Sequence, residues 1–179
     1  MNLRTIITGG PGAGKTTLIE TLAQRGFAVC DESGRAVIRE QMSIGGCGVP
    51  WRDPPRFAGL MLARDIRAWH RSSGASAPVF YDRGIPDIAG YLTLCGYPIP
   101  PCLTEAISRY RYATDVIILP PWRDVYAQDN ERKQSWQEAV ETWKAMAATY
   151  EQHGYRLTTL PPAPPAARAA QAMEIISGR

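Results

Sequence analysis

A glycine-rich segment near the start of the chain has the residue types and spacing that bind phosphate. Residues 9–16, GGPGAGKT, match the pattern G-x-x-x-x-G-K-[ST] and are called the phosphate loop below. Glycines let consecutive backbone N–H groups curl around phosphate oxygens, and a following helix adds the positive end of its dipole. We expect Lys15 to reach the β- and γ-phosphates of a nucleotide and the Thr16 hydroxyl to bind magnesium. The residues expected to contact the nucleotide are Gly10, Pro11, Gly12, Ala13, Gly14, Lys15, Thr16 and Thr17.

Two acidic segments are candidates for a carboxylate that binds magnesium. Asp31-Glu32 follows the apolar residues 27–30, and Asp82 follows the apolar residues 78–81. Magnesium keeps several waters and takes one or two carboxylates besides phosphate oxygens, so the carboxylate must end a strand near the phosphate loop. Asp31-Glu32 resembles an ATPase box with a magnesium-linked aspartate and a water-activating glutamate. Asp82 has the alternative role of capping a helix that begins near Pro86.

Arginine residues gather in the segment between the two acidic candidates. An anionic substrate would suit them, because the planar guanidinium binds carboxylate and phosphate with two parallel hydrogen bonds. The alternative is a helix with one solvated basic face. The residues concerned are Arg35, Arg39, Arg52, Arg56, Arg64, Arg67 and Arg71.

The spacing of apolar residues predicts the elements that position these side chains. Short apolar runs predict strands at residues 3–8, 27–30, 78–81, 116–119 and 155–160. Helical spacing predicts helices at 16–25, 34–42, 58–71, 86–95, 102–112, from near Ser135, and at 166–176. Strands that alternate with helices indicate an α/β domain with a mostly parallel sheet. Residues 43–56 are rich in glycine and proline and predict a long loop, a kind of loop that often serves function.

Composition limits the classes of protein to consider. The chain has 179 residues, 45% of them apolar and 21% charged, with a formal net charge of +3. We expect one domain over residues 1–179 and no nucleic-acid partner. Four cysteines and two histidines lack the spacing of zinc or redox sites, which favours free thiols. No apolar run approaches the ~20 residues of a membrane span, so we expect a cytoplasmic protein without a membrane partner. The oligomeric state stays open.

Four segments together resemble a family of small P-loop ATPases and kinases. They are the phosphate loop, residues 31–35, residues 81–87, and Pro120-Pro121-Trp122 followed by residues 129–132. This family is catalogued with AAA-domain ATPases and is similar to the ribosylnicotinamide-kinase part of NadR and, more distantly, to thymidylate and deoxynucleoside kinases. The resemblance implies a three-layer fold with a five-stranded parallel sheet of order 2-3-1-4-5. In that order the third strand lies beside the first, which places Asp82 nearest the phosphates.

The resemblance also implies roles for particular side chains. Glu32 is expected to approach the acceptor hydroxyl as a base, although it could instead simply order Arg35 through an ion pair. Arg83 is expected to contact the transferring phosphate or the acceptor. Residues 122–134 are expected to form a lid over the nucleotide, with Arg132 and Arg123 as its basic residues. Residues 43–75 are expected to form an acceptor-side helical region.

The function that follows is an ATP- and Mg²⁺-dependent kinase. The catalytic residues would be Lys15, Glu32, Arg83 and Arg132, acting on a nucleoside- or nucleotide-like small molecule. ATP is favoured over GTP because the chain lacks an Asn-Lys-x-Asp motif, which reads guanine. The alternative is a nucleotide-dependent switch, or a slow ATPase, that acts through a protein partner. P-loop folds serve both purposes, so the resemblance does not separate them.

Overall fold

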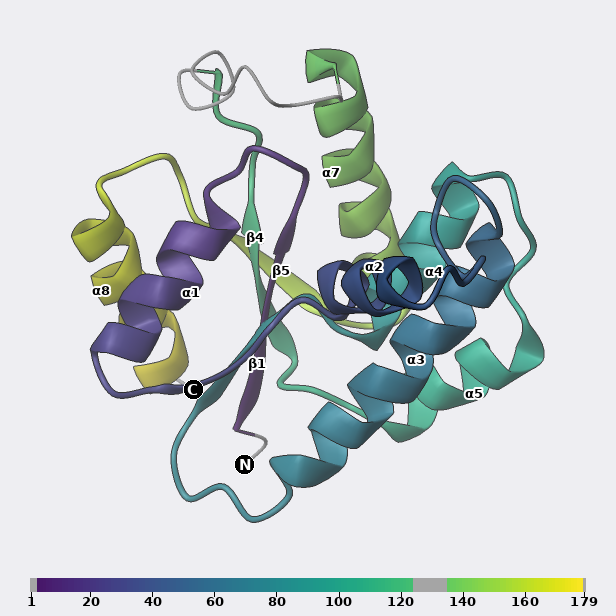
Figure 1. Cartoon of the computed structure of the whole chain (residues 1–179). Coiled ribbons are helices and arrows are strands. Elements are labelled where there is room, and N and C mark those ends of the chain that lie inside the picture. Colours follow the sequence, from purple (N-terminus) through teal and green to yellow (C-terminus); the bar gives the residue numbers. More distant parts are fainter. Residues whose placement is uncertain (1–2, 124–134, 179) are drawn as a thin grey trace.

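A parallel sheet lies at the centre of the computed structural model, which describes residues 3–123 and 135–178 (Figure 1). Its strands are β1 (Arg4–Gly9), β2 (Ala28–Cys30), β3 (Val79–Asp82), β4 (Asp115–Leu119) and β5 (Arg156–Thr159). Within the described residues these five strands pair in the order β2-β3-β1-β4-β5, all parallel. The predicted α/β fold and strand order are therefore confirmed. In particular, β3 lies beside β1, with Asp82 opposite Ile7.

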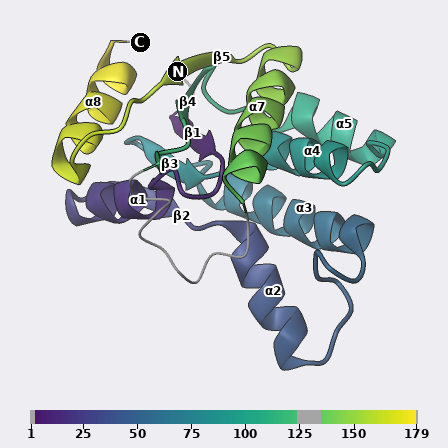
Figure 2. The same ribbon diagram turned by 90° about the horizontal axis from the view of Figure 1, so that it is seen from above.

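Helices cover both faces of the sheet (Figures 1 and 2). The helices on one face are α1 (Lys15–Gln24) and α8 (Pro165–Ser177). Those on the other face are α3 (Pro54–Arg71), α4 (Ile85–Leu94), α5 (Pro101–Arg109) and α7 (Trp136–Gln152). Helix α2 (Ser33–Ser43) packs against α3 and extends away from the sheet in Figure 2.

The two faces of the sheet bury separate apolar cores because neighbouring residues of a strand point to opposite sides. Ile6 and Tyr81 belong to the core under α3, α4, α5 and α7. Their neighbours Ile7 and Phe80 belong to the core under α1 and α8. All four side chains are at most 3% exposed. The carboxyl ends of β1, β2 and β3 consequently meet at one edge between two packed layers.

Helix starts follow from capping residues. Helix α7 begins after Ser135, whose Oγ accepts a hydrogen bond from the backbone N–H of Glu138 at 3.2 Å, as the sequence predicted. Helix α3 begins four residues before its predicted start. Asp53 caps it by accepting from the Arg56 N–H at 3.0 Å, and Pro54 is tolerated in the first turn, where its missing N–H has no partner to lose.

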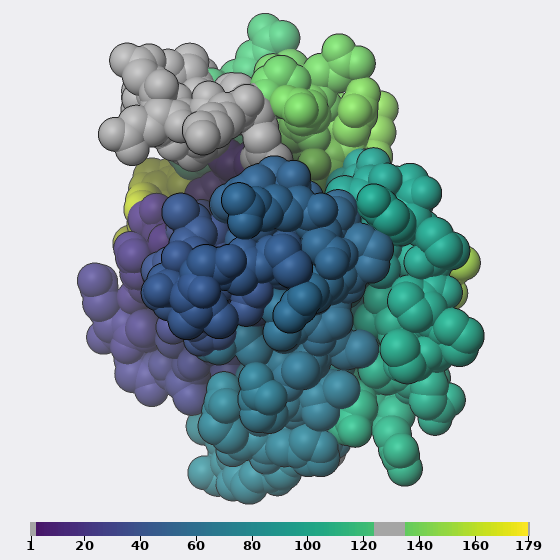
Figure 3. All heavy atoms as spheres, turned by 45° about the vertical axis from the view of Figure 1, so that its right-hand side comes forward, coloured from purple at the N-terminus to yellow at the C-terminus, as the bar shows by residue number. Residues whose placement is uncertain are grey.

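The cysteines and the character of the helices are the remaining features that bear on the sequence-based expectations. All four cysteines are free thiols. None of the described helices has the length and apolar character that crossing a membrane requires. Figure 3 shows α2, α3 and their connection as one continuous surface between α1 and the α4–α5 pair.

Candidate functional site: a phosphate loop open to an apolar cavity

The phosphate loop turns around a buried lysine. Gly12 and Gly14 have φ angles of 74° and 77°, in the left-handed region that glycine adopts without strain. The Lys15 ammonium donates to the carbonyl oxygens of Gly9 and Gly10 at 3.2 and 2.9 Å. Burial, and then the neighbouring Arg83 guanidinium, lower the pKa of Lys15 to about 8. A phosphate group placed here would supply the negative charge that this lysine lacks.

Two helices hold the phosphate loop from either side. A Cβ atom on Gly10 would lie 2.5 Å from the Ala139 carbonyl oxygen, so α7 packs directly on the loop backbone. On the other side Arg168 of α8, only 3% exposed, donates to the Ala13 carbonyl at 2.8 Å and to the Leu160 carbonyl at 3.3 Å. Sequence reasoning missed Arg168, because nothing in its neighbourhood distinguishes it from a surface arginine.

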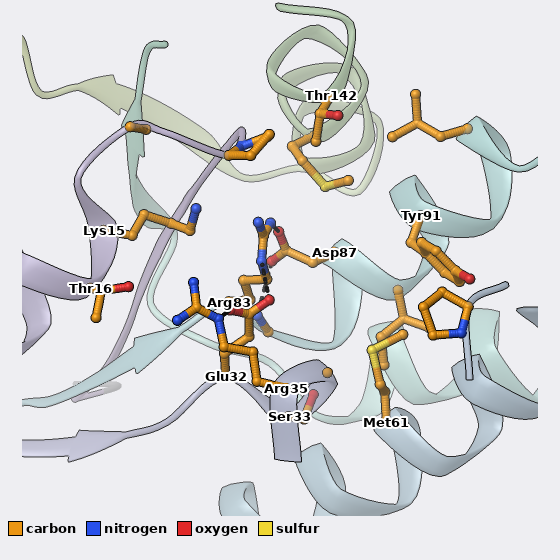
Figure 4. A pocket seen from close by; sticks show the side chains of 18 of the residues that line it. Lys15, Thr16, Glu32, Ser33, Arg35, Met61, Arg83, Asp87, Tyr91 and Thr142 are labelled. Atoms are coloured by element: carbon orange, nitrogen blue, oxygen red, sulfur yellow. Dashed lines mark hydrogen bonds and ion pairs between the residues drawn. The ribbon is translucent and has the colours of Figure 1, made fainter. Parts of the chain in front are cut away.

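Arg83 lies at the junction of β3 and α4 in an unusual backbone conformation. It is the one non-glycine residue with a positive φ, 70°, within residues 3–123 and 135–178. A left-handed conformation costs a residue with a Cβ atom roughly 1–2 kcal/mol. Its Nε lies 3.2 Å from Glu32 Oε1 and its Nη1 lies 3.1 Å from Asp87 Oδ1. The strained junction thus directs the guanidinium across the carboxyl ends of β2 and β3 (Figure 4).

Glu32 forms ion pairs with two arginines. Arg83 lies at 3.2 Å, and Arg35 on the first turn of α2 at 3.1 Å. Burial by itself raises the pKa of Glu32, but Arg83, Lys15 and Arg35 outweigh burial, so the pKa lies below its ordinary value. The side chain is therefore an ionised carboxylate at neutral pH. The predicted pair with Arg35 exists, and Figure 4 shows that Glu32 also points toward Arg83.

Asp82 ends the strand beside the phosphate loop, and one of its oxygens has no partner. It is 8% exposed, and Oδ1 is buried without a hydrogen bond. Burial raises the pKa of Asp82, and the nearby Lys15 ammonium partly opposes this rise. The capping role considered for Asp82 belongs to Asp87 instead, whose Oδ2 accepts from the Gly84 N–H at 2.9 Å at the start of α4.

Magnesium fits this donor set. Within the described residues no group of three or more histidine, cysteine, aspartate or glutamate side chains could hold a metal ion. Magnesium does not need such a cage beside a nucleotide, because waters and phosphate oxygens supply most of its ligands. The orphaned Asp82 oxygen and the Thr16 hydroxyl are the protein groups that could complete its shell.

Asp87 accepts hydrogen bonds from four residues in three parts of the structure. Besides Arg83 and the Gly84 N–H, it accepts from Thr8 Oγ1 of β1 and from the Tyr150 hydroxyl of α7, both at 2.5 Å. At 5% exposure it is a fully engaged buried carboxylate. Residues 81–87 carry part of the family resemblance, but sequence reasoning gave Asp87 no role of its own. Its position three residues after Gly84 was the available signal, because acidic side chains at the third helical position bond back to the helix start.

A cavity of about 950 Å³ begins at the phosphate loop and continues past Glu32 and Arg83. It reaches the space between α2, α3, α4 and α7, with Thr142, Met61 and Tyr91 around it in Figure 4. Its far walls are mainly apolar, lined by Ile38, Phe57, Met61, Ile88, Tyr91 and Met146. The Phe57 and Tyr91 rings meet edge to face with centroids 5.5 Å apart. A cavity of this size and character suits a small organic molecule in addition to phosphate.

The sequence of this chain matches the profile of one known protein family. The profile of a family described as "AAA domain" matches residues 4–168. The chain belongs to this AAA-domain family. No curated protein sequence matches the chain significantly.

Three solved structures share the fold of this AAA-domain protein at low identity. Thymidylate kinase from Ehrlichia chaffeensis has a TM-score of 0.65 and 12% identity, covering 97% of this chain and 98% of that one. Shikimate kinase from Acinetobacter baumannii, in complex with shikimate, has a TM-score of 0.56 and 17% identity, covering 99% and 94%. Deoxyadenosine kinase from M. mycoides, with bound dATP, has a TM-score of 0.55 and 13% identity, covering 97% and 99%.

Most of the arginines between residues 35 and 71 lie away from the cavity of this AAA-domain protein. Of those seven, Arg35 alone lines it. Arg64 pairs with Glu40 at 2.5 Å on the outer side of α2 and α3. The other five, all exposed, are Arg39, Arg52, Arg56, Arg67 and Arg71. The solvated basic face therefore describes this segment better than a binding site for an anionic substrate.

The predicted lid falls mostly outside the described residues. Residues 124–134, which include Arg132, are not described. Arg123 is exposed, and its guanidinium carbon lies 5.2 Å from the centroid of the Trp136 ring. The structure therefore leaves the roles of Arg132 and Arg123 as predictions.

Sequence reasoning also missed Asp65, the acidic residue of α3 that lines the cavity of this AAA-domain protein. Desolvation raises its pKa to about 7, against an opposing hydrogen bond with the Ser33 side chain. Phe57, Met61 and Asp65 are spaced four residues apart, so they lie on one helical face. That spacing, with a single acid on an apolar stripe, was the signal that could have identified it.

Proposed function

We propose that this protein is an ATP- and Mg²⁺-dependent kinase of a nucleoside- or nucleotide-like small molecule. The observation that carries the proposal is one continuous cavity that joins the phosphate loop, the Glu32–Arg83 pair and an apolar inner end. ATP hydrolysis needs only a water molecule beside the γ-phosphate, whereas this cavity has room for an organic acceptor. The kinase folds of the deoxyadenosine, shikimate and thymidylate enzymes support the same class of reaction.

In this proposal the phosphate loop binds the nucleotide. Backbone N–H groups of residues 10–17 would surround the phosphates, and Lys15 would leave its two carbonyl partners to contact the β- and γ-phosphates. Thr16 and Asp82 would hold magnesium, directly or through water. When bound, the ion supplies positive charge to the phosphate oxygens. The single orphaned oxygen of Asp82 supports this assignment over Glu32, whose oxygens are engaged by arginines.

Transfer then requires a base and a stabilised γ-phosphoryl group. Glu32 would take the proton of the acceptor hydroxyl while the acceptor oxygen forms a bond to the γ-phosphorus. The bond between that phosphorus and the β–γ bridging oxygen breaks, and ADP leaves with the electron pair. Phosphoryl transfer passes through a loose transition state, so a carboxylate of lowered pKa suffices to receive the proton late in the reaction. Lys15, Arg83 and Arg132 would balance charge on the equatorial oxygens.

The first test replaces the base. Glu32→Gln keeps the size of the side chain but does not accept a proton, so we expect kcat to fall by about 10²- to 10⁴-fold. Nucleotide affinity, measured by calorimetry, should change little, because Glu32 is not assigned to the nucleotide. Asp31→Asn is the matched control, because Asp31 is adjacent and exposed. Equal losses of kcat and nucleotide affinity in Glu32→Gln would contradict the role of base.

The alternative function has an observation of its own. Met42, Ile44 and Trp51 expose 64%, 75% and 63% of their area around the connection from α2 to α3, where a protein partner could pack. ADP release measured with nucleosides, nucleoside monophosphates and sugars separates the two functions. A kinase releases ADP in proportion to acceptor. If a protein partner stimulates turnover and no small molecule does, the switch or slow ATPase is correct.

A further inference from the structure

Arg168 places a buried guanidinium against the outer side of the phosphate loop. It lies on α8, which packs beside α1 (Figure 1). The side chain is 3% exposed, and it donates from Nη1 to the Ala13 carbonyl and from Nη2 to the Leu160 carbonyl. A Cβ atom on Gly14 would lie 2.9 Å from Nη1. The guanidinium therefore contacts two consecutive residues of the phosphate loop.

The charge of Arg168 has no negative partner in the described part of the chain. No carboxylate among residues 3–123 and 135–178 forms an ion pair with it, and its Nε is buried without a hydrogen bond. The guanidinium carbon lies 5.9 Å from the centroid of the Trp122 ring, at the outer limit of a cation–π contact, and that ring carries no net charge. Burial lowers the pKa of Arg168, but an arginine stays protonated in proteins.

The place of this charge is also unfavourable for folding. Helix α1 begins at Lys15, directly after Gly14, and its first turn contains no acidic residue. The N-terminal end of a helix carries partial positive charge, which repels a cation. Hydrogen bonds to two carbonyl groups need only a neutral donor, such as the amide of a glutamine. The two bonds of Arg168 therefore do not explain why a cation is buried at this position.

A bound polyphosphate would supply the missing negative charge. Gly14 lines the cavity and Arg168 does not, so the loop backbone lies between the guanidinium and the cavity. The C=O and N–H of a trans peptide point in opposite directions. Because Arg168 holds the Ala13 carbonyl, the N–H of Gly14 is directed to the cavity side, where phosphate oxygens would accept it. Charges on the two sides of this peptide interact strongly, because burial of Arg168 excludes water there.

We propose that Arg168 is a positioning residue for the nucleotide. It fixes the Ala13–Gly14 peptide with its N–H toward the phosphates, and the bound polyphosphate balances the charge of the guanidinium. Arg168 acts through the loop backbone and does not touch the nucleotide. The inference rests on the phosphate loop as the nucleotide site of the proposed function. It is independent of whether the γ-phosphoryl group passes to a small molecule or to water.

Two substitutions that separate the charge from the hydrogen bonds test this role. Arg168→Gln keeps a donor and removes the charge, whereas Arg168→Lys keeps the charge and loses the planar fork that holds both carbonyls. The full-length protein is titrated in a calorimeter with a non-hydrolysable ATP analogue and Mg²⁺, and separately with inorganic tripolyphosphate. The titrations are made at about pH 6.5, because a buried lysine loses its proton more readily at higher pH. We expect Arg168→Gln to weaken both ligands about 10-fold, and Arg168→Lys less than about 3-fold.

Arg25→Gln is the matched control for these substitutions. Arg25 also donates to a carbonyl of α8, that of Ala166 at 2.8 Å, but it is exposed and lies at the opposite end of α1. Its substitution should leave both affinities unchanged.

Urea unfolding without nucleotide gives a second readout. Since Arg168→Gln removes an unbalanced buried charge, its unfolding midpoint should equal or exceed that of Arg168→Lys, although Arg168→Lys binds nucleotide more tightly. If Arg168 only supported the loop, stability and affinity would fall together.

The possible outcomes distinguish this inference from the proposed function. Equal losses of affinity in Arg168→Lys and Arg168→Gln, or unchanged affinity in Arg168→Gln, would overturn the inference. Failure of both Arg168→Gln and Arg168→Met to fold would also overturn it, because folding would then require the charge. Binding that depends on this charge, without phosphoryl transfer to any acceptor, would support the inference and overturn the kinase function. A wild-type protein that binds neither ligand would overturn both.

Discussion

At the scale of one residue, Asp65 shows how a desolvated carboxyl group can reduce the stability of the fold. Its pKa is about 7 in the folded protein, compared with an ordinary value of 3.8, because the fold desolvates the carboxyl group. Between these two values the folded protein binds more protons than the unfolded chain. Stability is therefore fully present below about pH 4 and falls as pH rises through about 7.

Removing that charge should stabilise the protein. We expect Asp65→Asn to raise the free energy of unfolding at pH 8 by about 1–3 kcal/mol, discounted from roughly 1.4 kcal/mol per pKa unit because Asp65 is partly exposed. The gain should nearly vanish at pH 4. Urea unfolding at the two pH values measures both quantities, with Asp31→Asn as an exposed control. A gain of equal size at both pH values would contradict the assigned pKa.

Lys15 is the second residue whose substitution has a specific expected effect. Lys15→Ala should abolish nucleotide binding in calorimetry, because the buried ammonium is the lysine that the phosphate loop presents. The chain contains only two other lysines, Lys133 and Lys144. Lys144 is exposed on α7, so Lys144→Ala is the matched control and should retain affinity. Undiminished binding by Lys15→Ala would disprove the phosphate loop as the nucleotide site.

At the scale of elements, the packing of α7 on the phosphate loop determines the shape of the site. Gly10→Ala would place a methyl group 2.5 Å from the Ala139 carbonyl, and either the helix or the loop would have to move. We expect a loss of about 1–3 kcal/mol in unfolding free energy and weaker nucleotide binding.

Gly59→Ala is the control for this substitution, because it makes the same change in the exposed middle of α3, where nothing lies within 4 Å. It should instead stabilise the protein by about 0.5–1 kcal/mol through helix propensity. Urea unfolding and nucleotide calorimetry compare the pair. Similar effects of the two substitutions would show that α7 does not constrain the loop.

Across the whole molecule, Asp87 connects the layers that the cavity separates. It joins β1 through Thr8, the β3–α4 junction through Arg83 and Gly84, and α7 through Tyr150. An asparagine accepts at one atom only, so Asp87→Asn should leave buried donors unpaired and lower the unfolding free energy by about 2–4 kcal/mol. Tyr150→Phe, which removes one of these bonds, should cost less in the same urea experiment. A change below about 0.5 kcal/mol for Asp87→Asn, the range of an ordinary surface substitution, would refute this connecting role.

The sequence by itself determined the elements and the nucleotide half of the site. The phosphate loop is a contiguous segment whose glycines, lysine and threonine act through local backbone geometry, so its pattern predicts its structure. Hydrophobic spacing likewise predicted the α/β fold, because each strand or helix buries one face locally. The family resemblance then supplied the strand order, which the structure confirms.

Only the tertiary structure decided which side chains surround the proposed acceptor half. Glu32, Asp65 and Arg83 come from three separate elements, and long-range packing brings them to one cavity. Spacing places Asp65 on an apolar stripe of its helix, but it does not show that the carboxyl group is desolvated. No local pattern distinguishes Arg64 and Arg67 from ligands of an anion. Burial makes that distinction, because it removes water from Asp65 and leaves the arginines in solvent. The same desolvation raises the pKa of Asp65, an effect that only the folded structure produces.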